Sequence, residues 1–340
     1  MKSSVLVIGG AGFIGSNAAA YFAQKGWEVI VFDNFSRAGA EKNVEWLAEV
    51  APSIEVVRGD IVTDNELLSE LVERVDHVLH LAAQVAVTTS IEDPRMDFEN
   101  NIVGTFNVLE AIRLSKRRPS LLYASTNKVY GALEHIPLHE SDTRHDFHDV
   151  RVGVHEGENL DFHSPYGCSK GAAEQYVRDY SRIYGLKTVV FRQSCIYGYR
   201  QFGIEDQGWV AWFLIATMLN KPITIYGDGK QVRDILFIDD LVDLYHRAMT
   251  NIDTVSGHIF NTGGGRDNAL SLHEFFSILQ ELHGREIPFG YAPERAGDQK
   301  IFISDNGKLK QMLGWEPKVG KHEGIKLLKQ WVEDHKHYFV

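Results

Sequence analysis

Cysteine is nearly absent from this chain, whose 340 residues include only two, Cys168 and Cys195. Two cysteines cannot build the disulfide framework that holds small secreted proteins together, and such sparing use fits a reducing compartment. The opening stretch MKSSVLVIGG reaches its glycines too soon to contain the apolar region of a secretory signal. We therefore expect a cytoplasmic protein.

Long apolar runs and an excess of positive charge are also missing. No stretch approaches the roughly 20 apolar residues of a membrane-spanning helix. Acidic residues outnumber basic ones by 46 to 35, which gives a formal net charge of −11. This balance disfavours nonspecific attraction to nucleic acid or anionic lipid, so we predict neither as a partner. Local positive groups would have to hold any anionic ligand.

Short apolar runs, by contrast, alternate regularly with amphipathic helical patterns over roughly the first 195 residues. The runs are SVLVIG, EVIVFD, IEVVRGD, DHVLHLAA, SLLYAST and KTVVFRQS. Buried strands joined by crossover helices form a parallel sheet that is covered on both faces. We predict an α/β fold with a Rossmann-type doubly wound parallel sheet.

This alternation ends near residue 196, where a smaller domain is expected to begin. GWVAWFLIATMLN and IDDLVDLYHRAM have helical patterns, and GHIFNTGGG has the pattern of a strand that ends in glycines. Because this last helix and strand can rejoin the first sheet, we assign residues 1–196 and 233–268 to the first domain. Residues 197–232 and 269–340 would form a discontinuous substrate domain.

A glycine-rich turn follows the first predicted strand. VLVIGGAGFIGSNAAAYFAQKG places Gly9, Gly12 and Gly15 three residues apart, between that strand and a helix. Glycines allow a tight turn and a close approach to a pyrophosphate, which the N-terminus of the helix also attracts. Since a strand precedes the turn, a helix follows it and an acidic residue ends the second strand, we predict a dinucleotide site.

That acidic residue, Asp33, favours NAD over NADP. A carboxylate there can accept hydrogen bonds from both hydroxyls of the adenosine ribose, and it repels a 2′-phosphate. Arg37 keeps NADP open as an alternative, because an arginine at this place can bind that phosphate. Asp60 is placed to reach the adenine amino group, unless it is a solvated turn residue.

Tyr166 and Lys170 lie four positions apart in HSPYGCSKGAAEQYV. On a helix this spacing puts both side chains on one face. A free tyrosine has a pKa of about 10 and is a poor base at neutral pH. A neighbouring ammonium and a positively charged nicotinamide would both stabilise the phenolate, so we expect a lowered pKa and a role in proton transfer.

Six ordered motifs extend these observations along nearly the whole chain. They are GGAGFIG, LHLAAQ, NNIVGTFNVLEA, ASTNKVYG, SPYGCSK and GDGKQVRDILFIDD. Together they resemble the extended short-chain dehydrogenase/reductase family of nucleotide-sugar enzymes. The resemblance implies that Tyr166 is the general base and acid, that Lys170 lowers its pKa and binds the nicotinamide ribose, and that Thr126 hydrogen-bonds the reacting oxygen.

The same resemblance implies NAD as cofactor, a nucleotide sugar as substrate, and a homodimer or homotetramer. The implied cofactor-binding residues are Gly9, Gly12, Phe13, Ile14, Gly15, Asp33, Asn34, Ser36, Arg37, Asp60, Ile61, Leu81, Ala82, Ala83, Gln84, Asn101, Tyr166 and Lys170. The implied substrate-binding residues are Thr126, Asn127, Cys195, Gln207, Gly208, Trp209, Arg233 and Arg295. Arg233 and Arg295 would bind the diphosphate, although either could instead form a surface ion pair, and Trp209 could belong to the core.

Departures from the family pattern narrow the reaction. Asn127 and Lys128 stand where dehydratases of the family carry an Asp-Glu pair, so a dehydratase is disfavoured. Cys195 replaces the Asn that many 4-epimerases and decarboxylases carry three residues after the arginine of the sixth strand, here Arg192. The stretches STNKVYG and RQFGIEDQGWVAWF are most similar to members that invert C2 of a CDP-linked dideoxyhexose, which is the reaction we expect.

Other functions stay open at this point. A UDP-sugar 4-epimerase, a decarboxylase or a reductase would share the same hydride step, whereas an NAD-binding sensor would have no need of Tyr166 and Lys170. The histidine-containing loop 139–163 is expected to cover the sugar as a polar lid. Its histidines have no spacing typical of metal ligands, so we predict no metal site.

Overall fold

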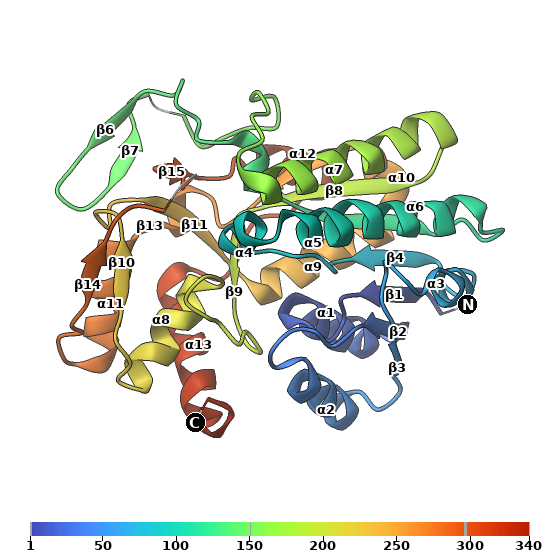
Figure 1. Ribbon diagram of the computed structural model, residues 1–340, viewed down its shortest axis with the longest axis horizontal. Coiled ribbons are helices and arrows are strands. Elements are labelled where there is room, and N and C mark those ends of the chain that lie inside the picture. Colours follow the sequence, from blue (N-terminus) through green and yellow to red (C-terminus); the bar gives the residue numbers. More distant parts are fainter. Residues whose placement is uncertain (1, 150, 296–297, 340) are drawn as a thin grey trace.

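The larger part of the protein is built on a seven-stranded sheet (Figure 1). The computed structural model describes residues 2–149, 151–295 and 298–339. All neighbouring strands of this sheet pair in parallel, in the order β3-β2-β1-β4-β5-β8-β12. The strands are β1 (Ser4–Ile8), β2 (Glu28–Asp33), β3 (Glu55–Arg58), β4 (His77–His80), β5 (Ser120–Thr126), β8 (Thr188–Gln193) and β12 (Ile259–Thr262). The predicted Rossmann-type α/β fold is confirmed.

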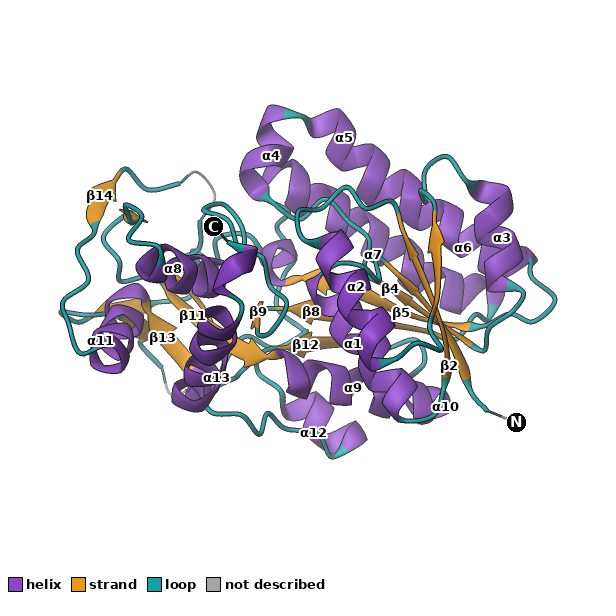
Figure 2. Cartoon of the chain, turned by 90° about the horizontal axis from the view of Figure 1, so that it is seen from below, coloured by secondary structure: helices purple, strands orange, loops and turns teal. Residues whose placement is uncertain are grey.

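Helices cover both faces of the sheet (Figure 2). They include α1 (Phe13–Gln24), α2 (Ala40–Val50), α3 (Asn65–Val72), α6 (Gly104–Leu114), α7 (Ser164–Tyr184) and α9 (Ile238–Thr250). The apolar side chains of α3, α6 and α7 share one core with one face of the sheet, and those of α1 and α9 share another core with the opposite face. This double burial explains why the central strands are apolar throughout rather than alternating.

Between β4 and α6 the polypeptide forms a series of short helices. These are α4 (Val87–Glu92), α5 (Pro94–Phe98) and the π-helical turn η1 (Glu99–Val103). The remaining short helices of the larger part are η2 (Asn127–Tyr130), which follows β5 directly, and α10 (Ile252–Val255).

The smaller part lies to the left in Figure 1. Its helices are α8 (Trp209–Met218), α11 (Leu272–His283) and α13 (Lys321–Asp334), with short turns η3 (Arg266–Asn268) and η4 (Lys336–Tyr338). Helix α12 (Gly307–Leu313) instead packs against β12 of the large sheet. Its strands are β9 (Cys195–Tyr197), β10 (Thr224–Tyr226), β11 (Val232–Phe237), β13 (Ala269–Ser271), β14 (Gly290–Ala292) and β15 (Ile301–Phe302). Strand β11 pairs with β9, β13 and β15, while β10 pairs with β14.

The carboxyl ends of the parallel strands meet at one edge of the large sheet. Asp33 ends β2, Thr126 ends β5 and Gln193 ends β8, and β9 follows β8 after a single residue. The chain therefore enters the smaller part from the edge where doubly wound sheets bind their ligands.

The expectation that loop 139–163 covers the sugar as a polar lid stays a prediction. The loop contains the hairpin of β6 (Leu138–Glu140) and β7 (His145–Phe147), which extends at the upper left of Figure 1. The hairpin packs on the smaller part through His145, whose backbone N–H donates to the carbonyl of Lys230 at 3.0 Å. Neither cavity considered below is lined by residues 139–149 or 151–163.

Across the described ranges, no helix combines the length and apolar character needed to cross a membrane.

Candidate active site

The glycine turn between β1 and α1 brings backbone segments into close contact. Gly9 has a φ of +80°, and a Cβ there would lie 2.6 Å from the backbone nitrogen of Ala82. A Cβ on Gly15 would lie 2.2 Å from the carbonyl oxygen of Gly9. Gly12 directly precedes the first residue of α1. Gly9 and Gly15 therefore require glycine, and the turn leaves the helix N-terminus facing a cavity that fits a dinucleotide pyrophosphate.

Asp33, at the end of β2, is anchored in place by backbone groups. Its two carboxylate oxygens accept hydrogen bonds from the backbone nitrogens of Ala11 at 2.9 Å and Phe35 at 2.8 Å. Burial raises the pKa of Asp33, and these backbone N–H groups oppose that rise. Asp60 is held by Asn34, whose amide donates to its carboxylate at 2.7 Å. Both carboxylates line the cavity beside the glycine turn.

Arg37 faces the interior of that cavity. Desolvation in the cavity lowers the pKa of its guanidinium, while Tyr166 and Asp33 act in the opposite direction. The arginine therefore lies within electrostatic reach of both the β2 end and the tyrosine, which places it along the cleft rather than outside it.

Most of the predicted cofactor-binding residues line this cavity, which has a volume of about 220 Å³. They are Gly9, Gly12, Phe13, Ile14, Gly15, Asp33, Asn34, Ser36, Arg37, Asp60, Ile61, Leu81, Ala82, Ala83, Tyr166 and Lys170. Gln84 and Asn101 do not line it and instead hydrogen-bond each other, since the backbone nitrogen of Gln84 donates to the Asn101 side chain at 2.9 Å. Sequence reasoning missed Val85, Asn100, Ser125 and Gln193, which also line the cavity.

Tyr166 and Lys170 both project from the first half of α7 and are buried, with exposed fractions of 8% and 4%. Thr126 and Tyr166 line the same larger cavity, and Thr126 acts to lower the pKa of the Tyr166 phenol. The Lys170 ammonium lies 4.3 Å from the centroid of the Tyr123 ring, a favourable cation–π position. The structure thus brings together the three predicted catalytic side chains at the carboxyl edge of the sheet.

The electrostatics of this group differ from the expectation that Lys170 lowers the pKa of Tyr166. Burial raises the pKa of Tyr166 to about 12, and the opposing effects of Thr126 and Arg37 do not cancel it. Burial also lowers the pKa of Lys170 to about 7, against the influence of Asp97 and Glu174. Desolvation outweighs the neighbouring charges, because a buried phenolate and a buried ammonium both lose water.

A closed hydrogen-bond network supports this face of α7. The Asn101 amide donates to the Asp97 carboxylate at 3.0 Å and to the Ser169 hydroxyl at 2.9 Å. The Ser169 hydroxyl donates in turn to the Tyr166 carbonyl at 3.2 Å. Asp97 and Asn101 are each 1% exposed, and Asn101 lies in the π-helical turn η1. The irregular turn therefore fixes the backbone from which Tyr166 projects.

A second and larger cavity of about 530 Å³ adjoins the first and shares Tyr166 and Ser125 with it. All the predicted substrate-binding residues line it: Thr126, Asn127, Cys195, Gln207, Gly208, Trp209, Arg233 and Arg295. The indole N–H of Trp209 donates to the Cys195 sulfur at 3.4 Å, and burial raises the pKa of that thiol. Tyr166 therefore stands where the two cavities meet.

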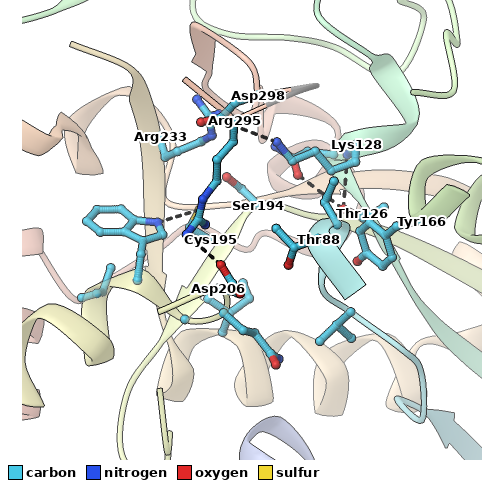
Figure 3. A pocket seen from close by; sticks show the side chains of 18 of the residues that line it. Thr88, Thr126, Lys128, Tyr166, Ser194, Cys195, Asp206, Arg233, Arg295 and Asp298 are labelled. Carbon is cyan, nitrogen blue, oxygen red and sulfur yellow. Dashed lines mark hydrogen bonds and ion pairs between the residues drawn. The ribbon is translucent and has the colours of Figure 1, made fainter. Parts of the chain in front are cut away.

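Charged side chains are concentrated in the larger cavity (Figure 3). Asp298 pairs with both Arg233 and Lys128, and Arg295 pairs with Asp206 at 2.7 Å. Although burial acts to raise it, the pKa of Asp298 falls to about 2 because Arg233 and Lys128 are so close. Sequence reasoning treated Lys128 only as a departure from the dehydratase pattern and missed Asp298 and Gln201, although YAPERAGDQ and RQFG contain these two residues.

A cluster of three or more histidine, cysteine or acidic side chains able to hold a metal ion does not occur in the part of the chain that the structure describes.

This fold and these two adjoining cavities define a dinucleotide-dependent enzyme of the extended short-chain dehydrogenase/reductase type. Residues 5–263 match the NAD dependent epimerase/dehydratase family, and the chain belongs to it. It is similar to CDP-paratose 2-epimerase of Salmonella typhi, with 46% identity covering 96% of this chain and 98% of that protein.

Solved structures of nucleotide-sugar enzymes share the whole fold. The UDP-glucose 4-epimerase of Thermotoga maritima, crystallised with UDP-glucose, has a TM-score of 0.84 and 32% identity, covering 98% of this chain and 99% of its own. That of Thermus thermophilus, in complex with NAD, has a TM-score of 0.80 and 33% identity, covering 97% and 99%. The chain is thus an isomerase that carries out NAD-dependent epimerisation of a nucleotide sugar.

Proposed function

We propose that this enzyme inverts C2 of CDP-paratose to give CDP-tyvelose. The observation that carries the proposal is the joint cavity, which connects Tyr166 and Thr126 to Arg233 and Arg295. The full-length similarity to a CDP-paratose 2-epimerase supports the choice of sugar and base. Asn127 and Lys128 support it further, because an amide cannot act as the acid, and an ammonium cannot act as the base, of the Asp-Glu pair with which dehydratases of the family eliminate water.

In this proposal Tyr166 takes the proton of the C2 hydroxyl and Thr126 orients that oxygen. Bound NAD would supply the hydride chemistry needed at C2. The sugar turns in the cavity as a 2-keto intermediate, and Tyr166 gives the proton back. Lys170 would hold the nicotinamide ribose beside Tyr166, and Asp33 would accept hydrogen bonds from the hydroxyls of the adenosine ribose.

The predicted domains keep their roles in the proposal, and so do the predicted site residues other than Gln84 and Asn101. Residues 1–196 and 233–268 would form the NAD-binding domain, and 197–232 and 269–340 the nucleotide-sugar-binding domain, with β11 at their border. That β12 lies in the large sheet supports this division. The free thiols of Cys168 and Cys195 suit the reducing cytoplasm in which we place the enzyme.

We also propose that the protein is a homodimer or homotetramer that pairs through α6 and α7. Large apolar side chains on these two helices face solvent, including Phe106 at 42%, Tyr176 at 48% and Ile183 at 66% exposure. The rings of Phe106 and Tyr176 lie together, 6.1 Å apart. Contiguous exposed apolar groups of this kind mark interaction surfaces.

A screen of CDP-, UDP-, GDP- and dTDP-sugars, followed by NMR assignment of the product, tests the function. The proposal expects turnover of CDP-paratose with inversion at C2 alone. Inversion of a UDP-sugar at C4 would instead establish the second candidate, a UDP-sugar 4-epimerase, which the likeness to UDP-glucose 4-epimerases supports.

A further inference from the structure

Two positively charged side chains in the larger cavity share a single carboxylate oxygen. Oδ1 of Asp298 lies 2.6 Å from Nη2 of Arg233 and 3.3 Å from Nζ of Lys128. The three side chains are largely buried, with exposed fractions of 9% for Arg233, 20% for Lys128 and 30% for Asp298. The Arg233 guanidinium and the Lys128 ammonium therefore both contact one oxygen atom. They are close enough together for a single anionic group to contact both.

The cluster carries more positive than negative charge. Burial lowers the pKa of Lys128, the charge of Arg233 lowers it further, and Asp298 counters both. Holding two desolvated cations close together costs free energy that one carboxylate only partly offsets. An anion with more charge and more oxygen atoms than a carboxylate would satisfy the pair better, and a diphosphate has both.

Arg295, the third cation of the cavity, is already balanced. It pairs with Asp206 at 2.7 Å, and its guanidinium lies 4.0 Å from the centroid of the Tyr226 ring. It also donates to the carbonyl of Glu205 at 3.4 Å. These contacts tie Arg295 to the segment that leads into α8, so Lys128 and Arg233 are the cations best placed to receive a phosphate.

The position of Lys128 indicates which phosphate it would meet. Lys128 follows Thr126 by two residues, and its backbone nitrogen donates to the Thr126 hydroxyl at 3.2 Å. In Figure 3 its side chain extends from the side of Thr126 and Tyr166 toward Asp298 and Arg233. A sugar whose reacting carbon lies at Tyr166 would therefore place its own phosphate next to Lys128 and the nucleoside phosphate nearer Arg233.

We propose that Lys128 is a substrate-binding residue that pairs with the sugar-side phosphate, and that the diphosphate replaces Asp298 as the common anion of Lys128 and Arg233. The inference rests on the proposed binding of a nucleotide sugar, and it assigns a role to Lys128 at the position where dehydratases carry the Glu of their Asp-Glu pair. In the absence of substrate, the Asp298 carboxylate offsets the repulsion between Lys128 and Arg233. The diphosphate offsets this repulsion once the substrate has bound.

Comparison of CDP with CMP isolates the sugar-side phosphate, because CMP lacks it. Calorimetric titration of the NAD-loaded enzyme should show that Lys128→Met weakens CDP binding by roughly 10- to 100-fold, the effect of losing one charged hydrogen bond. CMP binding should change by less than about threefold, within the range of an uninvolved side chain. Lys128→Arg should recover part of the CDP affinity, since it keeps the charge. Lys310→Met, at a lysine that is 63% exposed, is the matched control and should change neither.

Asp298→Asn tests the second half of the inference. Removing a carboxylate that competes with the diphosphate should leave CDP binding as tight as in the wild type or tighter. If Asp298→Asn instead weakened CDP as much as Lys128→Met does, the carboxylate would be part of the binding site and the proposed exchange would be wrong.

Other results would overturn the role of Lys128 without touching the proposed function. Equal losses of CDP and CMP affinity, or CDP affinity within about threefold of the wild type, would place Lys128 away from the sugar-side phosphate. If the wild type bound uridine but not cytidine nucleotides, the proposed nucleobase of the substrate would be wrong. The same comparison with UDP and UMP would then still test the role of Lys128. Should Lys128→Met lose bound NAD or unfold, Lys128→Gln replaces it in the same comparison.

Discussion

Tyr166 and Lys170 lie one helical turn apart on α7, and burial shifts their pKa values in opposite directions, to about 12 for the phenol and about 7 for the ammonium. Both shifts favour the neutral form, since each group has lost water. The protein alone therefore holds a protonated Tyr166. A further positive charge next to the phenol, such as that of an oxidised nicotinamide, would bring its pKa toward the working range.

Tyr166→Phe tests the proton transfer directly. The variant should lower turnover by at least ~10²-fold and change substrate affinity little, because the phenol acts mainly on the proton. Steady-state kinetics together with the dissociation constant of the nucleotide sugar would separate the two effects. Turnover within about threefold of the wild type would show that Tyr166 is not the base.

Asp97→Asn should shift the pH profile of kcat/KM as a whole. The Asp97 carboxylate raises the pKa of both Tyr166 and Lys170, so its removal lowers both. Because both pKa values fall, both limbs of the profile should move to lower pH.

Other charged or titratable groups around these side chains stay unchanged in that variant, namely Arg37, His80, Tyr123 and Glu174. Glu99→Gln provides a control one residue beyond α5, at an exposed side chain that pairs with Arg95. Its profile should match the wild type. Limbs that stay in place for Asp97→Asn would show that the carboxylate does not act on the pair.

From the position of Asp33 we expect that the bound cofactor is NAD and that it stays bound during purification. Mass spectrometry of the supernatant of denatured wild-type protein should find NAD, and mainly NADP there would refute the role of Asp33. Asp33→Asn should release the dinucleotide during purification, because losing a charged hydrogen bond costs roughly 10- to 100-fold in affinity.

We expect that removing one partner of the buried Glu174–Arg192 ion pair strongly lowers the free energy of unfolding. Its side chains have exposed fractions of 0% and 3%, and the Arg192 guanidinium also donates to the Tyr130 hydroxyl at 2.8 Å. Glu174→Gln should destabilise the protein by about 3–5 kcal/mol in urea unfolding, since it leaves a buried guanidinium without its counter-ion. Asp253→Asn removes a partner of Lys187 that is 81% exposed, and it should cost no more than about 1 kcal/mol.

The sequence predicts the large sheet well because each buried strand is an unbroken apolar run between helical patterns. It also places Tyr166, Thr126 and Asp33, since each stands in a local motif at the end of a strand or in the helix beside it. The sequence does not predict the contact between Asp298 and Lys128, because the two residues lie 170 positions apart in the chain. It does not predict the packing of loop 139–163 either, because a polar segment without periodicity does not indicate the surface on which it packs.

The path of the C2 hydrogen gives the most direct test of the proposed reaction. Inversion by removing a proton next to a carbonyl would exchange that hydrogen with water, but a carbon that bears only a hydroxyl lacks the required acidity. Tyr166 is placed to handle the hydroxyl proton alone, so the carbon-bound hydrogen has to leave and return as hydride. Substrate deuterated at C2 should therefore give product that keeps its label there, and unlabelled substrate turned over in heavy water should gain none. Incorporation of solvent deuterium at C2 would refute transient oxidation. Retention of configuration at C2 with inversion at C4 would keep the mechanism and assign the enzyme to the 4-epimerases.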